Sequence, residues 1–205
     1  MRVFVLTTGR AASATFSEAA ALIDGMTAGH ETHRGMVDGR LDYPDNHIES
    51  DNRLVWFLGS LDRLYDDADT FYVYLHREPE SVARSYLERW HITVSVVRAF
   101  YHGILMHKNK PDAERALAAC RLFVTTVDDN IRFFLKHRQN WAEVRLGSLE
   151  ADFFQFMDKA GLRGDRDKIA AALRHRSNAS KRQGKRRGWL GRLQARFSAN
   201  KLNLP

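Results

Sequence analysis

The sequence predicts an α/β fold, in which helices flank a parallel β-sheet and make up the larger share of the chain. Three short apolar runs, rich in β-branched and aromatic residues, predict buried strands at residues 3–6, 71–76 and 141–146. A segment with helical spacing of apolar residues follows each run, and this alternation is typical of a parallel sheet with crossover helices. The 205 residues are enough for one such domain.

The first predicted strand leads into a tight loop and then a helix. Thr7-Thr8-Gly9 interrupts the apolar run, and from Ser13 onward apolar residues recur at helical spacing. A loop between a buried strand and a helix N-terminus presents backbone N–H groups at the positive end of the helix dipole. The pattern therefore predicts a P-loop-like anion-binding site, with phosphate as its usual ligand.

Residues 24–44 are rich in glycine and polar residues and are expected to form a loop. His30 and His33 lie in this loop, but their spacing differs from that of two histidines on one helix face, so we expect no metal site. A helix is expected to follow, with Ser50 or Asp51 as its N-cap and an apolar face from Leu54 onward.

The polar residues around this expected helix start have two interpretations. One is an ordinary capped start with an intrahelical ion pair between Glu49 and Arg53. The other is a functional rim beside the anion loop, in which His47 or Glu49 is the general base.

The second predicted strand, residues 71–76, also ends at a cation, Arg77, and Pro79 fits the first position of a helix. We expect this helix to run towards Met106. Further helices are expected at residues 112–137, 152–160 and 163–174, with the third strand before the last two.

Charge and cysteine content limit the classes of function. The net charge of +7 includes eight Lys/Arg and no Asp/Glu at residues 181–205, so residues 1–180 carry a net charge of −1. A near-neutral body argues against a nucleic-acid partner. One cysteine, Cys120, allows no intrachain disulfide, and no segment has the length of a signal-peptide core or a membrane span. We expect a cytoplasmic protein.

The basic segment 177–205 is expected to lie outside the domain formed by residues 1–176. It has three interpretations: a disordered solubilising end, a lid over a bound nucleotide, or a basic amphipathic helix. The third would give peripheral contact with the inner membrane surface and would suit a lipid or envelope-sugar acceptor.

Both strand-to-helix turns resemble those of sulfotransferases that use 3′-phosphoadenosine 5′-phosphosulfate. Thr8-Gly9-Arg10-Ala11-Ala12-Ser13 resembles their 5′-phosphosulfate loop, and Arg77 with Ser85 matches the spacing of their Arg-Asp/Asn-Pro-x-x-Val-Ala-x-Ser motif. Bacterial members often carry a His-Ile/Leu-Glu-x-Asp-x-Arg-Leu segment, which residues 47–54 match, so the resemblance favours the general-base interpretation.

Three residues depart from the family pattern. Ala12 stands where the family usually has glycine, and Ala14 stands where it usually has a hydroxyl. Thr15 is a candidate for the missing hydroxyl, and Glu78 replaces the usual Asp or Asn.

The resemblance implies transfer of a sulfuryl group from this nucleotide to a hydroxyl or amine of a small-molecule, carbohydrate or lipid acceptor, without a metal. Arg10 and either His47 or Glu49 are the implied catalytic residues. The implied nucleotide-binding residues are Gly9, Arg10, Ala11, Ala12, Ser13, Ala14, Thr15, Arg77 and Ser85, with Lys185, Arg186 and Gly188 of the basic segment.

Two alternatives remain at this point. One is a nucleotide-dependent, kinase-like phosphotransferase, although the Gly-Lys-Ser/Thr of the triphosphate loop is absent. The other is a catalytically silent nucleotide-binding or membrane-associated scaffold, which Ala12 and Ala14 make plausible.

Overall fold

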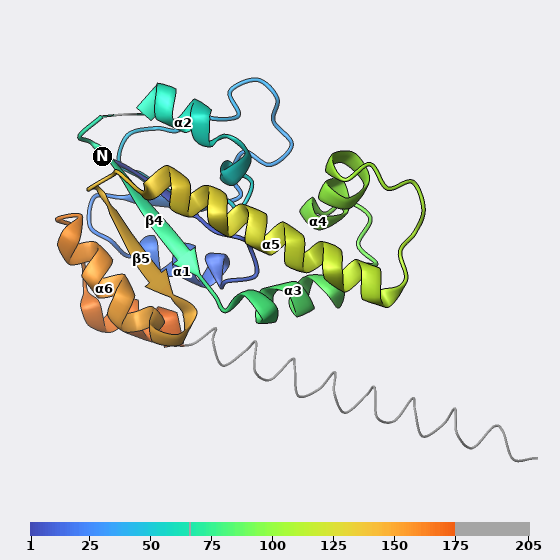
Figure 1. Ribbon diagram of the computed structural model, residues 1–205. Coiled ribbons are helices and arrows are strands. Elements are labelled where there is room, and N and C mark those ends of the chain that lie inside the picture. The colour runs from blue at the N-terminus through green and yellow to red at the C-terminus, as the bar shows by residue number, and fades with distance from the viewer. Residues whose placement is uncertain (66, 175–205) are drawn as a thin grey trace, which may run out of the picture.

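The computed structural model describes residues 1–65 and 67–174, which build a five-stranded parallel sheet flanked by helices (Figure 1). The strand order is β2-β3-β1-β4-β5, and every neighbouring pair is parallel. The strands are β1 (Arg2–Leu6), β2 (Thr27–His30), β3 (His47–Ser50), β4 (Thr70–His76) and β5 (Trp141–Arg145). The predicted fold class is confirmed.

Helices cover both faces of this sheet. The α-helices are α1 (Ser13–Ala20), α2 (Leu58–Tyr65), α3 (Pro79–Leu87), α4 (Val96–Ala99), α5 (Ala113–Leu135) and α6 (Leu149–Lys159), and a further helix spans 166–174. Short turns of other helix types are η1 (Leu54–Trp56), η2 (Phe100–Ile104) and η3 (Leu146–Ser148). Within the described residues, no helix is both long and apolar enough to cross a membrane.

The central strand β1 explains why its apolar run is continuous. Val3 and Val5 pack into a core formed with α1 and α6, whereas Phe4 and Leu6 pack into a second core formed with α2, α3 and α5. A strand that is buried on both faces needs apolar residues at consecutive positions, as the sequence predicts.

The segment 24–50 differs from the expectation. Residues 27–30 form strand β2 at the edge of the sheet, and residues 47–50 form β3 instead of a helix start. These short strands exist because they pair with neighbours, Ile48 lying in register between Val3 and Ala28. The expected intrahelical pair of Glu49 with Arg53 is therefore wrong.

The expected long helix from Pro79 is also interrupted. α3 ends at Leu87, and the chain turns before Ser95 caps α4 by accepting a hydrogen bond from the N–H of Arg98 at 3.4 Å. β-Branched residues before Ser95 and its cap favour a new helix start over continuation. The expected helix at 112–137 is confirmed as α5, whereas the interpretations of residues 177–205 lie outside the described residues.

Candidate functional site

The loop after β1 has an unusual backbone. Gly9, Arg10 and Ala12 all have positive φ, at 81°, 59° and 66°. Within residues 1–65 and 67–174, no hydrogen bond uses the backbone N–H groups of residues 10–15. Successive N–H groups in such a curved loop form a concave site for an anion, so this loop fits the predicted anion site.

Tyr86 on α3 binds this loop through its hydroxyl group. Its hydroxyl donates to the carbonyl of Thr8 at 2.8 Å and accepts from the amide of Asn52 at 3.4 Å. A Cβ at Gly9 would lie 2.3 Å from the Tyr86 hydroxyl, so only glycine fits this close approach. Burial raises the pKa of Tyr86 to about 12, which keeps the phenol protonated as a hydrogen-bond donor.

The second strand-to-helix turn lies against the first. Arg77, at the end of β4, donates to the carbonyl of Arg10 at 2.9 Å, and Arg10 donates through Nε to the hydroxyl of Ser85 at 3.1 Å. Glu78 accepts from the N–H groups of Glu80 and Ser81 at 2.9 and 2.6 Å, which caps α3. This carboxylate therefore serves as an N-cap, as an Asp or Asn would. Arg10, Arg77 and Ser85, which the sequence predicts as ligands of one nucleotide, are in contact.

This site is strongly cationic. Burial and the nearby charges of Arg89 and Arg77 lower the pKa of Arg10, although a guanidinium remains charged at neutral pH. None of these three arginines forms an ion pair with a carboxylate of the described residues. A dianionic ligand would supply the missing negative charge.

His47 and Glu49 lie in a different environment. Glu49 is fully buried and accepts from the N–H and hydroxyl of Thr32, at 2.9 and 2.7 Å, and makes a 3.1 Å contact with Nε2 of His47. Nδ1 of His47 lies 2.8 Å from the Thr27 hydroxyl. Burial acts to raise the pKa of Glu49, but the hydrogen bonds from His47 and Thr32 outweigh it and lower that pKa.

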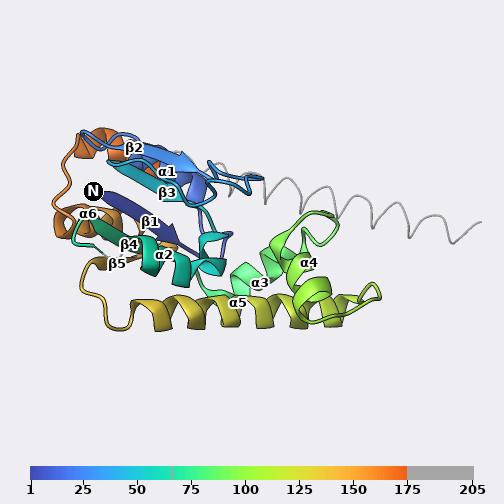
Figure 2. The same ribbon diagram turned by 90° about the horizontal axis from the view of Figure 1, so that it is seen from above.

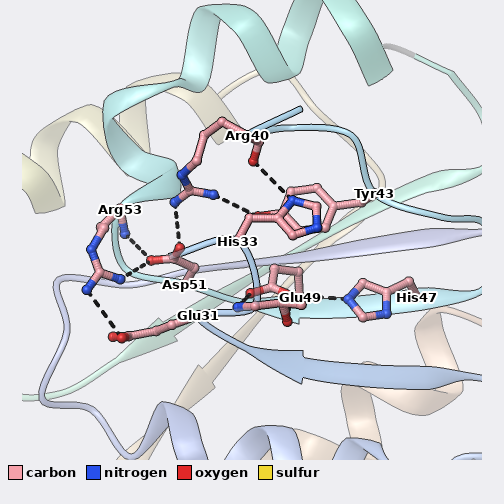
Figure 3. A network of polar contacts seen from close by, with 9 residues as sticks. Glu31, His33, Arg40, Tyr43, His47, Glu49, Asp51 and Arg53 are labelled. Atoms are coloured by element: carbon pink, nitrogen blue, oxygen red, sulfur yellow. Dashed lines mark hydrogen bonds and ion pairs between the residues drawn. The ribbon is translucent and has the colours of Figure 1, made fainter. Parts of the chain in front are cut away.

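These contacts show that His47 and Glu49 join β3 to the segment that precedes it (Figure 3). Within the described residues, their hydrogen bonds join them to one another and to Thr27 and Thr32, and none reaches residues 7–15. They therefore anchor the 31–46 connection to the sheet and do not form the rim of the anion loop that the sequence predicts.

A second group of side chains in Figure 3 fastens the same connection to the end of β3. Asp51 is fully buried and binds Arg40 at 2.6 Å and Arg53 at 3.0 Å. Arg53 also pairs with Glu31 at 3.2 Å, and the ring of His33 stacks on Tyr43. Since each of these charges has an opposite partner, Arg40 and Arg53 are already paired, and removing one partner would leave a buried charge uncompensated.

One exposed titratable group does reach the anion loop. His30, the last residue of β2, lies with Nε2 2.9 Å from the hydroxyl of Ser13, the first residue of α1. The sequence pattern relates His30 only to His33, as a pair of possible metal ligands, because it does not predict strand β2. Within the described residues, no group of three or more His, Cys, Asp or Glu side chains is placed to hold a metal ion.

The other predicted site residues are distributed as follows. Ala11 and Thr15 are buried, whereas Ser13 and Ala14 at the start of α1 are partly exposed beside the free N–H groups. Lys185, Arg186 and Gly188 lie outside the described residues.

Comparison with known proteins gives one informative match. No protein-family model matches the chain, and no curated protein matches it. Among solved structures, the chain is similar to a sulfotransferase domain from the curacin biosynthetic pathway, with a TM-score of 0.56 and 15% sequence identity. The match covers 80% of this chain and 78% of that one. At this identity the likeness shows that the fold is sulfotransferase-like.

Proposed function

We propose that this protein is a sulfotransferase that moves a sulfuryl group from 3′-phosphoadenosine 5′-phosphosulfate to a hydroxyl or amine. The observation that carries the proposal is the contact of Arg10 with Ser85, together with that of Arg77 with the Arg10 carbonyl. The family resemblance assigns these residues to the two ends of one nucleotide, and the sulfotransferase-like fold supports the assignment.

The residues at the site fit this nucleotide. The free N–H groups of residues 10–15, with the Arg10 guanidinium and the Ser13 hydroxyl, would bind the 5′-phosphosulfate. Arg77 and Ser85 would bind the 3′-phosphate. In this proposal Lys185, Arg186 and Gly188 cover the nucleotide, and no metal takes part.

For the general base we propose His30 in place of His47 or Glu49. His30 is exposed and contacts Ser13 of the anion loop, whereas Glu49 is fully buried with its oxygens occupied. When the Ser13 hydroxyl turns to the phosphosulfate, Nε2 of His30 becomes free to accept a proton.

In the proposed step, the sulfuryl group passes directly from the nucleotide to the acceptor. The acceptor oxygen or nitrogen forms a bond to sulfur while the bond from sulfur to the 5′-phosphate oxygen breaks, and the acceptor's proton passes to His30. Fixed cations and N–H groups would stabilise the negative charge that develops on the leaving phosphate. We further propose a small-molecule, carbohydrate or lipid acceptor and a cytoplasmic location.

Calorimetric titration with adenosine 3′,5′-bisphosphate tests this function. We expect micromolar binding, and we expect Arg77→Ala to weaken it about tenfold to a hundredfold, because hydrogen bonds to charged groups contribute about 1.5–3 kcal/mol each. Arg84→Ala is the matched control: it removes a cation from α3, the helix that follows Arg77, where Arg84 pairs with Glu80 and is 62% exposed. Arg84→Ala should leave the affinity unchanged.

The other outcomes separate the alternatives. Binding of ATP with magnesium, but not of the bisphosphate, would favour a kinase-like phosphotransferase. Binding of the bisphosphate without transfer to any acceptor would favour a silent scaffold. A folded protein that binds neither would show that the resemblance covers only the fold.

A further inference from the structure

The connection between α3 and α5, residues 88–111, exposes several apolar side chains. Val94 is 92% exposed, Met106 73%, Ile104 62% and Ile92 39%. Figure 2 shows this connection, with α4 in it, beyond the carboxyl ends of the strands, on the side where the anion loop lies. Single exposed apolar residues are common, but four in one connection indicate a surface that contacts something apolar.

The same connection is basic. Residues 88–111 contain four Lys/Arg and three His, against one acidic residue, Glu88. Lys108 and Lys110 are exposed, and Arg89 lies close enough to Arg10 to lower the pKa of that guanidinium. The exposed apolar side chains therefore share this connection with cations, and Arg89 extends its positive charge to the Arg10 site.

Both ends of the connection pack on one buried ring. The ring of Trp90 meets that of Tyr101 at 5.5 Å, edge to face, and the ring of His107 stacks on Tyr101 at 4.5 Å. Tyr101 is only 2% exposed. This shared contact brings the two ends of the connection close together in space.

We propose that residues 88–111 bind the surface of an anionic lipid bilayer. Val94, Ile104 and Met106 enter the boundary between headgroups and acyl chains, while Lys108 and Lys110 lie at the anionic headgroups. An anionic bilayer matches both features of the connection, since aliphatic side chains can enter its apolar boundary while Lys108 and Lys110 meet its anionic headgroups. This inference does not depend on sulfuryl transfer.

A fluorescent probe at Val94 tests the proposal in the full chain. The variant Val94→Cys is labelled with an environment-sensitive dye. Cys120 is buried, and burial raises the pKa of its thiol to about 12, so it resists labelling. Phe133→Cys is the control: Phe133 is 82% exposed near the other end of α5, roughly 30 Å from the start of that helix.

With vesicles of equimolar phosphatidylcholine and phosphatidylglycerol, we expect a blue shift from the dye at position 94 and none at position 133. Vesicles of phosphatidylcholine alone should give a much smaller response. Binding of the protein to vesicles without a shift at position 94 would overturn the proposal, because another segment would then make the contact. An equal response to soluble polyglutamate would also overturn it, in favour of an acidic protein partner.

Sedimentation with the same anionic vesicles gives a second test. We expect the pair Val94→Asp and Ile104→Asp to lower the bound fraction at limiting lipid about tenfold, because apolar insertion is lost and negative charge is added. The pair Leu122→Asp and Phe133→Asp adds the same charge at exposed positions of α5 and should have little effect. Equal losses in the two variants would contradict the proposal, since added negative charge alone would then explain them.

Discussion

At the scale of single residues, Tyr86 links the two halves of the candidate site. Its hydroxyl binds the carbonyl of Thr8, while its neighbour Ser85 binds Arg10 two residues further along the loop. Adjacent residues of α3 therefore hold both the backbone and the cation of the anion loop. Such supporting contacts fix the geometry on which binding depends.

We predict that Tyr86→Phe weakens binding of adenosine 3′,5′-bisphosphate about threefold to tenfold, because losing the hydroxyl's hydrogen bonds to Thr8 and Asn52, about 1 kcal/mol each, lets the loop relax. Calorimetry measures the affinity, and urea unfolding measures the stability. Tyr65→Phe is the matched control, since Tyr65 is also buried and donates to a backbone carbonyl, that of Leu41. Equal affinity losses in both variants would contradict a specific role for Tyr86.

We predict that His30→Ala lowers kcat about a hundredfold or more and leaves bisphosphate affinity nearly unchanged, because general-base catalysis contributes about 10²–10⁴-fold. Steady-state rates with an acceptor found by screening, and inhibition by the bisphosphate, give both quantities. His137→Ala, at an exposed histidine just after α5, should behave as the unsubstituted protein. An unchanged kcat in His30→Ala would exclude His30 as the base.

At the scale of elements, β3 and the residue after it contain buried polar side chains that bind the connection formed by residues 31–46. His47, Glu49 and Asp51 are buried beneath residues 31–46, and their contacts with Thr32 and Arg40 join that connection to the sheet. Burial of these three side chains is tolerated because each has hydrogen-bond or ion-pair partners.

The lowered pKa of Glu49 makes this element sensitive to acid. In the unfolded chain the carboxyl has its ordinary pKa of 4.5, and in the folded chain its pKa is lower. The ionised form is therefore favoured by folding, so its stabilising effect is complete above the unfolded pKa and is lost as pH falls through the folded pKa.

We predict that Glu49→Gln lowers the free energy of unfolding by about 1–3 kcal/mol at neutral pH, because it weakens the buried hydrogen bonds from Thr32 and His47. The difference from the unsubstituted protein should shrink as pH falls below 4.5. Urea unfolding over this pH range measures it. Glu114→Gln removes an exposed carboxylate from the first turn of α5 and should not change the pH dependence. A constant difference at all pH values would contradict the assignment.

At the scale of the whole molecule, charge is divided between two regions. Residues 1–180 are nearly neutral overall, although three of their arginines, Arg10, Arg77 and Arg89, lie close together. Residues 181–205 carry eight Lys/Arg and no Asp or Glu. An anionic nucleotide would attract both regions.

We predict that the pair Lys185→Ala and Arg186→Ala weakens bisphosphate binding about tenfold, because each cation lost removes a charge-assisted contact with the 3′-phosphate side of the nucleotide. The pair Arg192→Ala and Arg196→Ala removes the same charge from the same segment and serves as the control in calorimetry. Equal losses would indicate only a general attraction, and no loss in either pair would exclude the lid interpretation.

The sequence by itself predicted β1, β4, β5, α5 and the loop that joins β1 to the next helix. Their signals are local: a strand buried on both faces needs a continuous apolar run, and a long helix repeats its apolar face many times. The loop was recognisable because Gly9 and Arg10 stand between such a strand and a helix start.

Only the tertiary structure decided the rest. β2 and β3 are four-residue strands that exist through pairing with their neighbours, and local periodicity carries little information about such pairing. Because β3 is a strand, Glu49 and His47 are buried under the 31–46 connection and do not face the loop. Because β2 is a strand, His30 reaches Ser13. The candidate base thus depends on contacts between segments distant in sequence, whereas the anion loop depends on consecutive residues.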